Sequence, residues 1–443
     1  MDLNVLIVGG GIHGVGLLHD LASRNVKGVH LVEKNKISSG TSSRSTKLVH
    51  GGLRYLEHLN QWGLVYEALH ERALLLRLLK GIVTPLPFVL PNFKGDKRPP
   101  WVIRIGLFFY DLLSGDGGLP SASPLNKEDI IKFAPYLNQN KIENEMISAF
   151  LYYDAQMLDD VIARIAAEAA VKLGASYEEN TTVTEVKQIE NGFKVTIDSN
   201  GNKKTVTTKY IVNAAGAWCN ENLLRWGIVP KITCLLNLGT HIIFKPEAVP
   251  HAEINNCAAT LIQELDGRVV FFIPWFGQWL YGTTESILST EPSHIKYPQS
   301  DKDYLMHTAK ETLNLVDAEK NISEIFCGVR CMPLNQANRI TQIDSKWMDD
   351  IYNSPFYVKQ LDKNISGLSR ETVINETVPG LISIYGGKYT TYRAIGEKLG
   401  SYLSRKLHIG STTGTHLAEN WFLRELMEEK PEIFKSSASL RQN

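Results

Sequence analysis

The first 33 residues carry the feature that most constrains how this chain can fold. An apolar run at 3–8 precedes glycines in the spacing G-x-G-x-x-G, a small and apolar helix-like run follows, and a second apolar run at 29–32 ends in an acid. Such glycines permit a tight turn, close approach of the backbone to a pyrophosphate, and close packing of a helix on a strand. We therefore predict a parallel α/β domain that binds a dinucleotide. Its expected contacts are Gly9, Gly11, Ile12, His13, Gly14, Glu33 and Lys34.

A dense polar stretch at 41–58 follows this motif. It holds five small hydroxyl residues, two adjacent glycines and the basic side chains Arg44, Lys47, His50 and Arg54. In an NAD site the strand–helix alternation would normally continue here, so a hydroxyl-rich stretch at this point favours FAD. A polar surface loop is the alternative interpretation. The expected cofactor contacts are Thr41, Ser42, Ser43, Ser45, Thr46, Lys47, Gly51 and Gly52, whereas His50 suits a proton and Arg54 suits an anion.

Composition narrows the function classes. The chain has 47 basic residues (Lys and Arg) and 47 acidic ones (Asp and Glu), so its formal net charge is zero. The overall charge therefore does not favour nucleic-acid binding, and any basic site must be a local cluster. The 443 residues suit two domains, with three as the alternative.

Five scattered cysteines do not suit a disulfide framework, and Cys327 with Cys331 lacks the partners of a zinc site, so we predict no metal. No run predicts a membrane-spanning helix, and no signal peptide is expected, which favours a cytoplasmic location.

The segment 82–113 allows two interpretations. Residues 82–93 combine prolines with large apolar side chains, and a basic turn follows them. Residues 101–113 are apolar, and their charged residues are Arg104 and Asp111. The thirteen residues 101–113 are too few to cross a bilayer as a helix. It could lie in a membrane surface, with Trp101 and Tyr110 at the interface, or 101–113 could be a buried core helix.

Later segments predict the rest of a nucleotide domain and a second sheet. We expect helices at 63–80, 156–173, 300–316 and up to about 407, an antiparallel meander after Gly174, and antiparallel strands at 231–244, 268–274 and 278–284. A lone histidine in an apolar strand, as at His241, is more often structural than catalytic. A strand followed by two glycines and a helix, near 381–393, offers free amides to an anion. Further expected cofactor contacts are Val183, Ala215, Gly216, Trp218, Gly387, Lys388, Tyr389, Thr390 and Thr391.

Several separated motifs together resemble the FAD-dependent glycerol-3-phosphate dehydrogenases of the D-amino-acid-oxidase-like superfamily. They are Gly9–Gly14, 47–58, 99–111, Val212–Trp218, Gly328–Arg330 and Gly386–Arg393. The resemblance implies noncovalent FAD, oxidation of sn-glycerol 3-phosphate to dihydroxyacetone phosphate, and electron transfer to a membrane quinone, or in a minority of relatives to oxygen. It implies catalytic roles for His50 or His241 as base and for Arg330 and Lys388. It also implies substrate contacts from Arg54, Tyr55 and Arg370.

The resemblance also favours a membrane-facing surface at 82–110, a peripheral location on the inner face of the cell membrane, and a homo-oligomer. The family's C-terminal helical domain is expected to be largely absent. The predicted parts are a FAD-binding domain at 1–80, 151–230 and 371–408, a substrate- or membrane-facing insertion at 81–150, an antiparallel substrate domain at 231–370 and a tail at 409–443.

Other functions on the same fold stay open. One is the oxidation of a different polyol phosphate. A second is an amine or amino-acid oxidase, which would need one arginine for a carboxylate. A third is a flavin-binding protein without catalysis.

Overall fold

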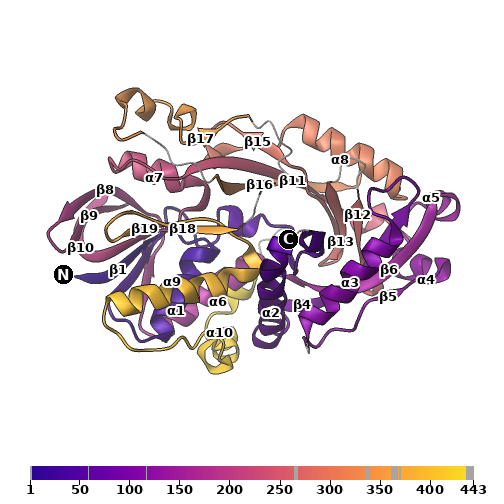
Figure 1. Ribbon diagram of the computed structural model, residues 1–443, viewed down its shortest axis with the longest axis horizontal. Helices are drawn as coiled ribbons and strands as arrows, with labels where there is room; N and C mark the ends of the chain where they lie inside the picture. The colour runs from indigo at the N-terminus through magenta and orange to yellow at the C-terminus, as the bar shows by residue number, and fades with distance from the viewer. Residues whose placement is uncertain are drawn as a thin grey trace.

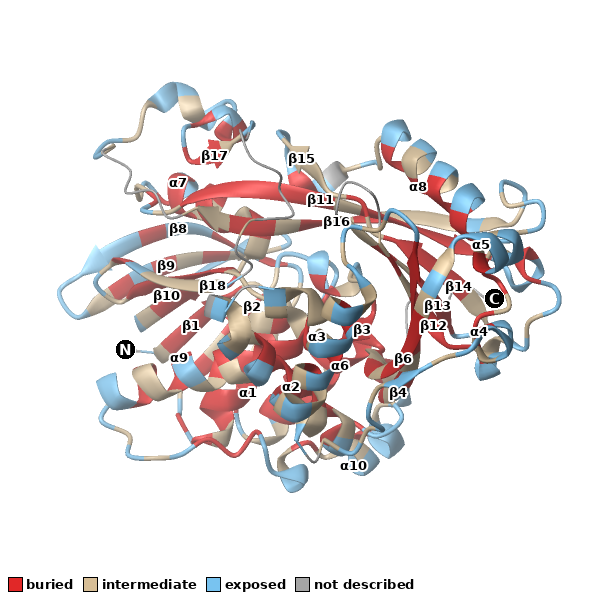
Figure 2. Cartoon of the chain, turned by 45° about the vertical axis from the view of Figure 1, so that its right-hand side comes forward, coloured by how far each residue is buried: buried red, intermediate tan, exposed pale blue. Residues whose placement is uncertain are grey.

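The computed structural model describes residues 2–435 except 58, 116, 264–267, 335–339, 361–367 and 369–370. Arg370, predicted to bind substrate, therefore lies outside the described residues. Two β-sheets lie side by side, with helices packed mainly against their outer faces (Figure 1). The strands at the centre of both sheets are mostly buried, whereas exposed residues gather on outer helices and turns (Figure 2).

The first sheet is the predicted nucleotide-binding α/β layer. Its order is β18-β19-β10-β1-β2-β7, and the run from β19 to β7 is parallel. The predicted meander, β8 and β9, pairs antiparallel with β10. Helices α1, α6 and α9 contribute to one core beneath the sheet. The strands are β1 (Leu3–Val8), β2 (Val29–Val32), β7 (Ser176–Glu178), β8 (Thr181–Ile189), β9 (Gly192–Ser199), β10 (Asn202–Asn213), β18 (Thr372–Val378) and β19 (Leu381–Gly386); the helices are α1 (Ile12–Ser23), α6 (Asp159–Lys172) and α9 (Tyr392–Lys406).

The second sheet joins segments that are far apart in the sequence. Strand β4 pairs antiparallel with β6 and parallel with β12, so the predicted insertion 81–150 and the predicted substrate region 231–370 share one sheet. The strands are β3 (Leu48–Val49), β4 (Val83–Phe93), β5 (Ser123–Pro124), β6 (Met146–Met157), β11 (Thr233–Phe244), β12 (Ala259–Gln263), β13 (Val269–Trp275), β14 (Gln278–Gly282), β15 (Ser286–Leu288), β16 (Ile322–Leu334) and β17 (Tyr357–Val358). The remaining helices are α2 (Trp62–Leu78), α3 (Pro100–Ser114), α4 (Lys127–Phe133), α5 (Gln139–Asn144), α7 (Cys219–Arg225), α8 (Gln299–Thr312) and α10 (Leu423–Glu429).

The expected helix at 156–173 begins later than predicted. Strand β6 runs to Met157, whose amide donates to the Lys47 carbonyl at 2.9 Å, and β6 also pairs with β3. This pairing holds 156–157 extended, so α6 starts at Asp159. The helix expected at 300–316 likewise ends early, at Thr312.

The segment 82–110 divides into two structures, so neither interpretation holds for the whole of it. Strand β4 is largely buried within the sheet, so this half does not present a surface to a membrane. Helix α3 is not a fully buried core helix either. It buries Ile103, Leu107 and Tyr110, whereas its opposite side exposes apolar side chains. Among the described residues, no helix is long and apolar enough to cross a bilayer.

Candidate cofactor and substrate site

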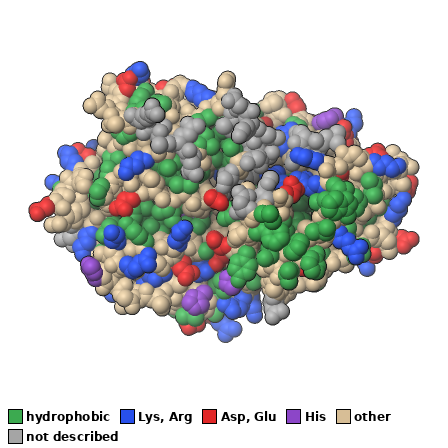
Figure 3. All heavy atoms as spheres, in the orientation of Figure 1, with side chains coloured by type: hydrophobic (Ala, Val, Ile, Leu, Met, Phe, Trp, Pro, Cys, Tyr) green, Lys and Arg blue, Asp and Glu red, His purple; other side chains and the backbone are tan. Residues whose placement is uncertain are grey.

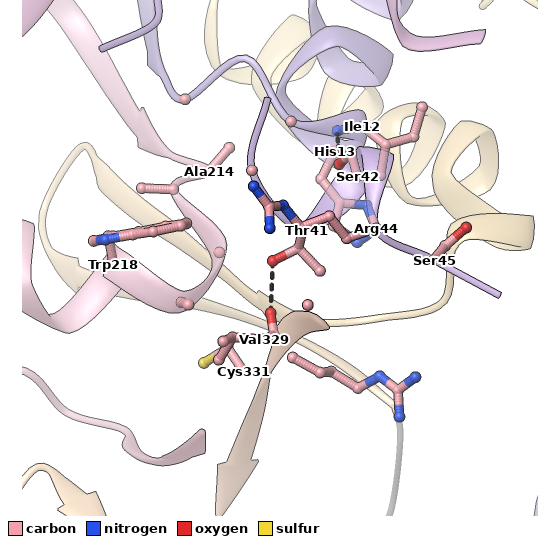
Figure 4. A pocket seen from close by; sticks show the side chains of 18 of the residues that line it. Ile12, His13, Thr41, Ser42, Arg44, Ser45, Ala214, Trp218, Val329 and Cys331 are labelled. Carbon is pink, nitrogen blue, oxygen red and sulfur yellow. Dashed lines mark hydrogen bonds between the residues drawn. The ribbon is translucent and has the colours of Figure 1, made fainter. Parts of the chain in front are cut away.

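A cavity of about 470 Å³ lies between the two sheets. The carboxyl ends of parallel strands, the 39–46 segment and the 386–390 segment form one side, and β11 with β16 forms the other. Figure 4 shows this junction, where Thr41 and Arg44 lie between the N-terminal helix and Val329 of β16. The first side is here called the cofactor wall, and the β11–β16 side is called the substrate wall.

The glycines of the cofactor wall are required by close backbone contacts. Gly9 has a φ of +111°, and a Cβ there would lie 2.8 Å from the carbonyl oxygen of Ala214. A Cβ at Gly14 would lie 1.9 Å from the carbonyl oxygen of Gly9. These contacts press the α1 N-terminus against β1 and β10. Gly11 has more room, with Ser42 as its nearest neighbour at 3.3 Å, so the backbone there is open to a ligand.

The acid after β2 holds the turn and faces the cavity. The Glu33 carboxylate accepts hydrogen bonds from the amides of Gly10 at 2.6 Å and Asn35 at 2.8 Å. Burial raises the pKa of Glu33, while the two amides act in the opposite direction. Ser42 accepts from the Ile12 amide at 2.9 Å, so the hydroxyl-rich segment is fixed to the first turn of α1.

The segment 41–46 crosses strand β16 at a glycine. The Thr41 hydroxyl donates to the Val329 carbonyl at 2.6 Å, and Arg44 Nη1 donates to the Cys327 carbonyl at 3.2 Å. Between these contacts, a Cβ at Gly328 would lie 2.9 Å from both Cβ and the carbonyl oxygen of Arg44. Gly328 therefore allows the cofactor wall to lie directly on the substrate wall.

A buried ion pair supports this segment from behind. Lys47 Nζ donates to both Asp159 carboxylate oxygens, at 2.7 and 2.9 Å, and to the Ser43 carbonyl at 2.6 Å. The same carboxylate accepts from the Ser45 hydroxyl at 2.7 Å, and the Asp159 carbonyl accepts from the Tyr389 hydroxyl. The Lys47 side chain thus points away from the cavity, and Asp159 connects the 41–46 and 386–390 segments to the start of α6.

The substrate wall presents alternate residues of β11 and the consecutive residues 328–331 of β16. Asn237, Gly239 and His241 of β11 line the cavity, and Asn237 pairs directly with Arg330 of β16. The His241 ring stacks on Phe326 with centroids 4.9 Å apart, and Nε2 lies 3.0 Å from the Thr46 hydroxyl. Burial first, then the charges of Lys47 and Arg330, lowers the pKa of His241 to about 3, so the imidazole is neutral at pH 7.

The 386–391 segment brings a cation to the substrate end. Lys388 Nζ lies 4.0 Å from the centroid of the Tyr55 ring, and the Thr390 hydroxyl lies 3.3 Å from the His50 amide. A Cβ at Gly387 would lie 2.8 Å from His13 Nε2, so the second glycine pair packs on the fingerprint helix. The cavity therefore has nucleotide-binding backbone at one end and two cations with histidines at the other.

The structure places most, but not all, of the predicted site residues in the cavity wall. Gly14 lies behind the turn, and Lys47 points into the protein. Those in the wall are Gly9, Gly11, Ile12, His13, Glu33, Lys34, Thr41, Ser42, Ser45, Thr46, His50, Tyr55, Val183, Ala215, Gly216, Trp218, His241, Arg330, Gly387, Lys388, Tyr389 and Thr390. Those outside it are Gly14, Ser43, Lys47, Gly51, Gly52, Arg54 and Thr391.

Several wall residues were not predicted. Asn237 comes from β11, residues 283–285 connect β14 with β15, and Arg44 comes from the polar stretch itself. No local motif marks Asn237, because only its pairing with Arg330 shows which way it faces. Asp159 was also missed, although an acid in the first turn of a predicted helix is a recognisable signal.

The wall fits a long flavin dinucleotide. The glycine turn and the α1 N-terminus suit a pyrophosphate, Glu33 suits the ribose hydroxyls, and Lys388 with the second glycine pair lies at the far end. A family model described as DAO, FAD dependent oxidoreductase, matches residues 4–393. The chain belongs to this family of FAD-dependent oxidoreductases. FAD is therefore its cofactor.

Relatives and solved structures agree with this assignment. A glycerol-3-phosphate dehydrogenase of Mycobacterium leprae (strain TN) is 31% identical over 400 residues, which cover 89% of this chain and 62% of that protein. A D-erythritol 1-phosphate dehydrogenase of Brucella abortus (strain 2308) is 32% identical over 405 residues, covering 89% and 72%. The chain spans less than two thirds of the length of the first of these relatives.

The fold is shared with a solved structure of the glycerol-3-phosphate dehydrogenase from Bacillus halodurans in complex with FAD. The TM-score is 0.69 at 22% identity, and the match covers 100% of this chain and 74% of that one.

Proposed function

We propose that this protein oxidises sn-glycerol 3-phosphate to dihydroxyacetone phosphate with noncovalently bound FAD and then passes the electrons to a quinone. The observation that carries the proposal is the substrate end of the cavity, where Arg330, Lys388 and the neutral His241 lie near a flavin-binding wall. Guanidinium and ammonium groups suit a phosphate, and a neutral imidazole suits removal of a hydroxyl proton.

Each residue takes one role in this proposal. His241 accepts the proton of the hydroxyl on carbon 2, and the contact between its Nε2 and the Thr46 hydroxyl orients the ring. Arg330 binds the phosphate, and Lys388 stabilises the developing alkoxide. Bound FAD supplies the hydride acceptor. His50 is the second candidate for the base, and Arg54 and Arg370 are further candidates for contacts with the phosphate.

A second candidate substrate is a longer polyol phosphate. The relative named D-erythritol 1-phosphate dehydrogenase is as similar in sequence as the glycerol-3-phosphate dehydrogenases. An amino-acid oxidase is less favoured, because a carboxylate needs one arginine, whereas Arg330 and Lys388 both line this cavity.

Anaerobic flavin reduction tests the proposal. Purified holoprotein is mixed with sn-glycerol 3-phosphate, D-erythritol 1-phosphate or an amino acid, and flavin absorbance is followed in a stopped-flow instrument. We expect rapid bleaching with a polyol phosphate. Bleaching by the amino acid alone would refute the proposal. Reoxidation of the reduced protein by oxygen, compared with a soluble quinone analogue, then identifies the electron acceptor.

We further propose that the protein docks on the cytoplasmic face of a membrane through helix α3. Its exposed stripe comprises Trp101, Ile105, Phe108 and Leu112, which are 66%, 49%, 63% and 63% exposed. Their spacing places them on one side of the helix, and hydrophobic side chains gather over α3 in Figure 3. Such a stripe, with Arg104 beside it, suits insertion at the lipid interface.

Flotation with anionic vesicles tests this docking. Phe108→Glu should abolish co-flotation, because it places a charge in the centre of the stripe, whereas Ile189→Glu, at the exposed last residue of β8, should not. Equal flotation of the Phe108 variant and the unmodified protein would contradict the proposal.

A further inference from the structure

The side-chain carbonyl of Asn237 is a buried polar group without a hydrogen-bond partner among the described residues. Asn237 lines the cavity but is only 3% exposed. Its carbonyl oxygen Oδ1 has no hydrogen-bond partner among the described residues. Leaving such a group unpaired in a buried position is unfavourable, so a bound ligand is the natural source of its hydrogen bond.

The sheet register places this amide in the substrate wall. Asn237 is directly opposite Arg330, and it lies on the same face of β11 as His241. Four residues along a strand correspond to about 13 Å between Cα atoms, so Asn237 and His241 lie at opposite ends of the wall. Gly239 and Gly328 form the pair between them, and these glycines leave room for Thr283 and Arg44 to pack against the centre of the wall.

The chemistry of the amide favours a hydroxyl as its partner. An amide presents an acceptor on one side and donors on the other, and a hydroxyl can pair with either because it both donates and accepts. A phosphate oxygen could pair only with the amide NH₂, and Arg330 already provides a charged donor beside it. A polyol phosphate carries hydroxyls in addition to the one that is oxidised.

We propose that Asn237 is a specificity-determining residue that binds a non-reacting hydroxyl of the polyol phosphate. This inference rests on the proposed function and deepens it. Asn237 thereby distinguishes a polyol phosphate from an analogue that lacks this hydroxyl, since an analogue leaves the amide buried and unpaired. Discrimination of this kind is strong, because the unpaired site group penalises the wrong substrate.

Two substrates and two variants test the proposal. The substrates are sn-glycerol 3-phosphate and its 1-deoxy analogue, propane-1,2-diol phosphate of matching configuration. We expect the unmodified holoprotein to prefer the first by about 10²-fold or more in kcat/KM. Asn237→Leu, of similar size, should lose most of this preference, through a lower kcat/KM for sn-glycerol 3-phosphate and little change for the analogue. Asn202→Leu, at an exposed position of β10 outside the cavity wall, should keep the preference.

The other outcomes are also decisive. Equal losses on both substrates would place Asn237 at the phosphate or the reacting carbon and overturn the inference. Loss of bound flavin in a folded variant would place it at the cofactor and also overturn it. If Asn237→Leu fails to fold, Asn237→Ser is tested in the same way. If neither substrate reduces the flavin of the unmodified protein, the proposed function itself fails, and the inference fails with it.

Discussion

The two walls of the cavity are built on different principles. The cofactor wall depends on backbone shape, and its glycines and the first turn of α1 lie close together in the sequence. The substrate wall depends on side chains of β11 and β16, which long-range pairing brings together. A local motif therefore encodes the cofactor, whereas the substrate depends on the register of a sheet. Substitutions in the first wall should affect FAD, and those in the second should affect the substrate.

Gly14→Ala should have the largest effect. The new Cβ would lie 1.9 Å from the Gly9 carbonyl oxygen, so the turn must open and α1 must move away from β1. We expect protein that retains almost no flavin, measured by the ratio of visible to ultraviolet absorbance. Gly63→Ala, whose Cβ meets open space, is the control and should retain flavin fully. A normal flavin content in Gly14→Ala would contradict the statement that flavin binding depends on the backbone shape of the cofactor wall.

Asp159→Asn tests the ion pair that supports the cofactor wall. Without the carboxylate, the Lys47 ammonium remains buried without its partner, which typically costs about 3–5 kcal/mol. We expect a lower free energy of unfolding in urea and weaker flavin retention, because the Asp159 carboxylate also accepts a hydrogen bond from Ser45 in the cofactor wall. Asp160→Asn is the matched control on the same helix, since Asp160 pairs with Arg164 outside the cavity. Equal flavin loss in both variants would show that the ion pair has no specific role.

Gly328→Ala tests the contact between the walls. Its Cβ would press on Arg44, so the 41–46 segment must shift by a few tenths of an ångström. We expect flavin content near normal and a KM for the polyol phosphate raised about tenfold, as small displacements in a preorganised site are costly. An unchanged KM together with lost flavin would assign Gly328 to the cofactor wall instead.

His19→Gln should have the smallest effect, and it concerns stability away from both walls. The ring packs against Trp421, and Nε2 lies 3.1 Å from the Asn420 carbonyl. Burial lowers the pKa of His19 to about 4. Between about pH 6.5 and 4 the unfolded chain therefore binds a proton that the folded chain does not, so stability falls as the pH falls. The variant should lose less Tm than the unmodified protein between pH 7 and 4.5, and equal losses would contradict the pKa shift.

The same contrast explains which predictions from the sequence succeeded. The order of strand, glycine turn, helix and strand in the sequence predicted β1, α1 and β2. This prediction succeeded because the spacing of apolar residues and the choice of turn residues act within short stretches of chain. Lys47 was assigned to the cofactor from its position among hydroxyl residues, but the structure turns it towards Asp159, which is distant in sequence. The 82–110 segment was treated as one unit, although its first half is a strand whose partners, β6 and β12, could not be inferred locally.

By itself, the sequence determined the cofactor end of the molecule. Glycines at fixed spacing and an acid after the second strand act through backbone geometry within a few turns of chain, so their meaning does not depend on distant partners. Only the tertiary structure decided which polar residues face the substrate. Asn237, His241 and Arg330 share one wall because β11 and β16 pair in a particular register, and a shift of one residue would turn each strand's side chains to the opposite face.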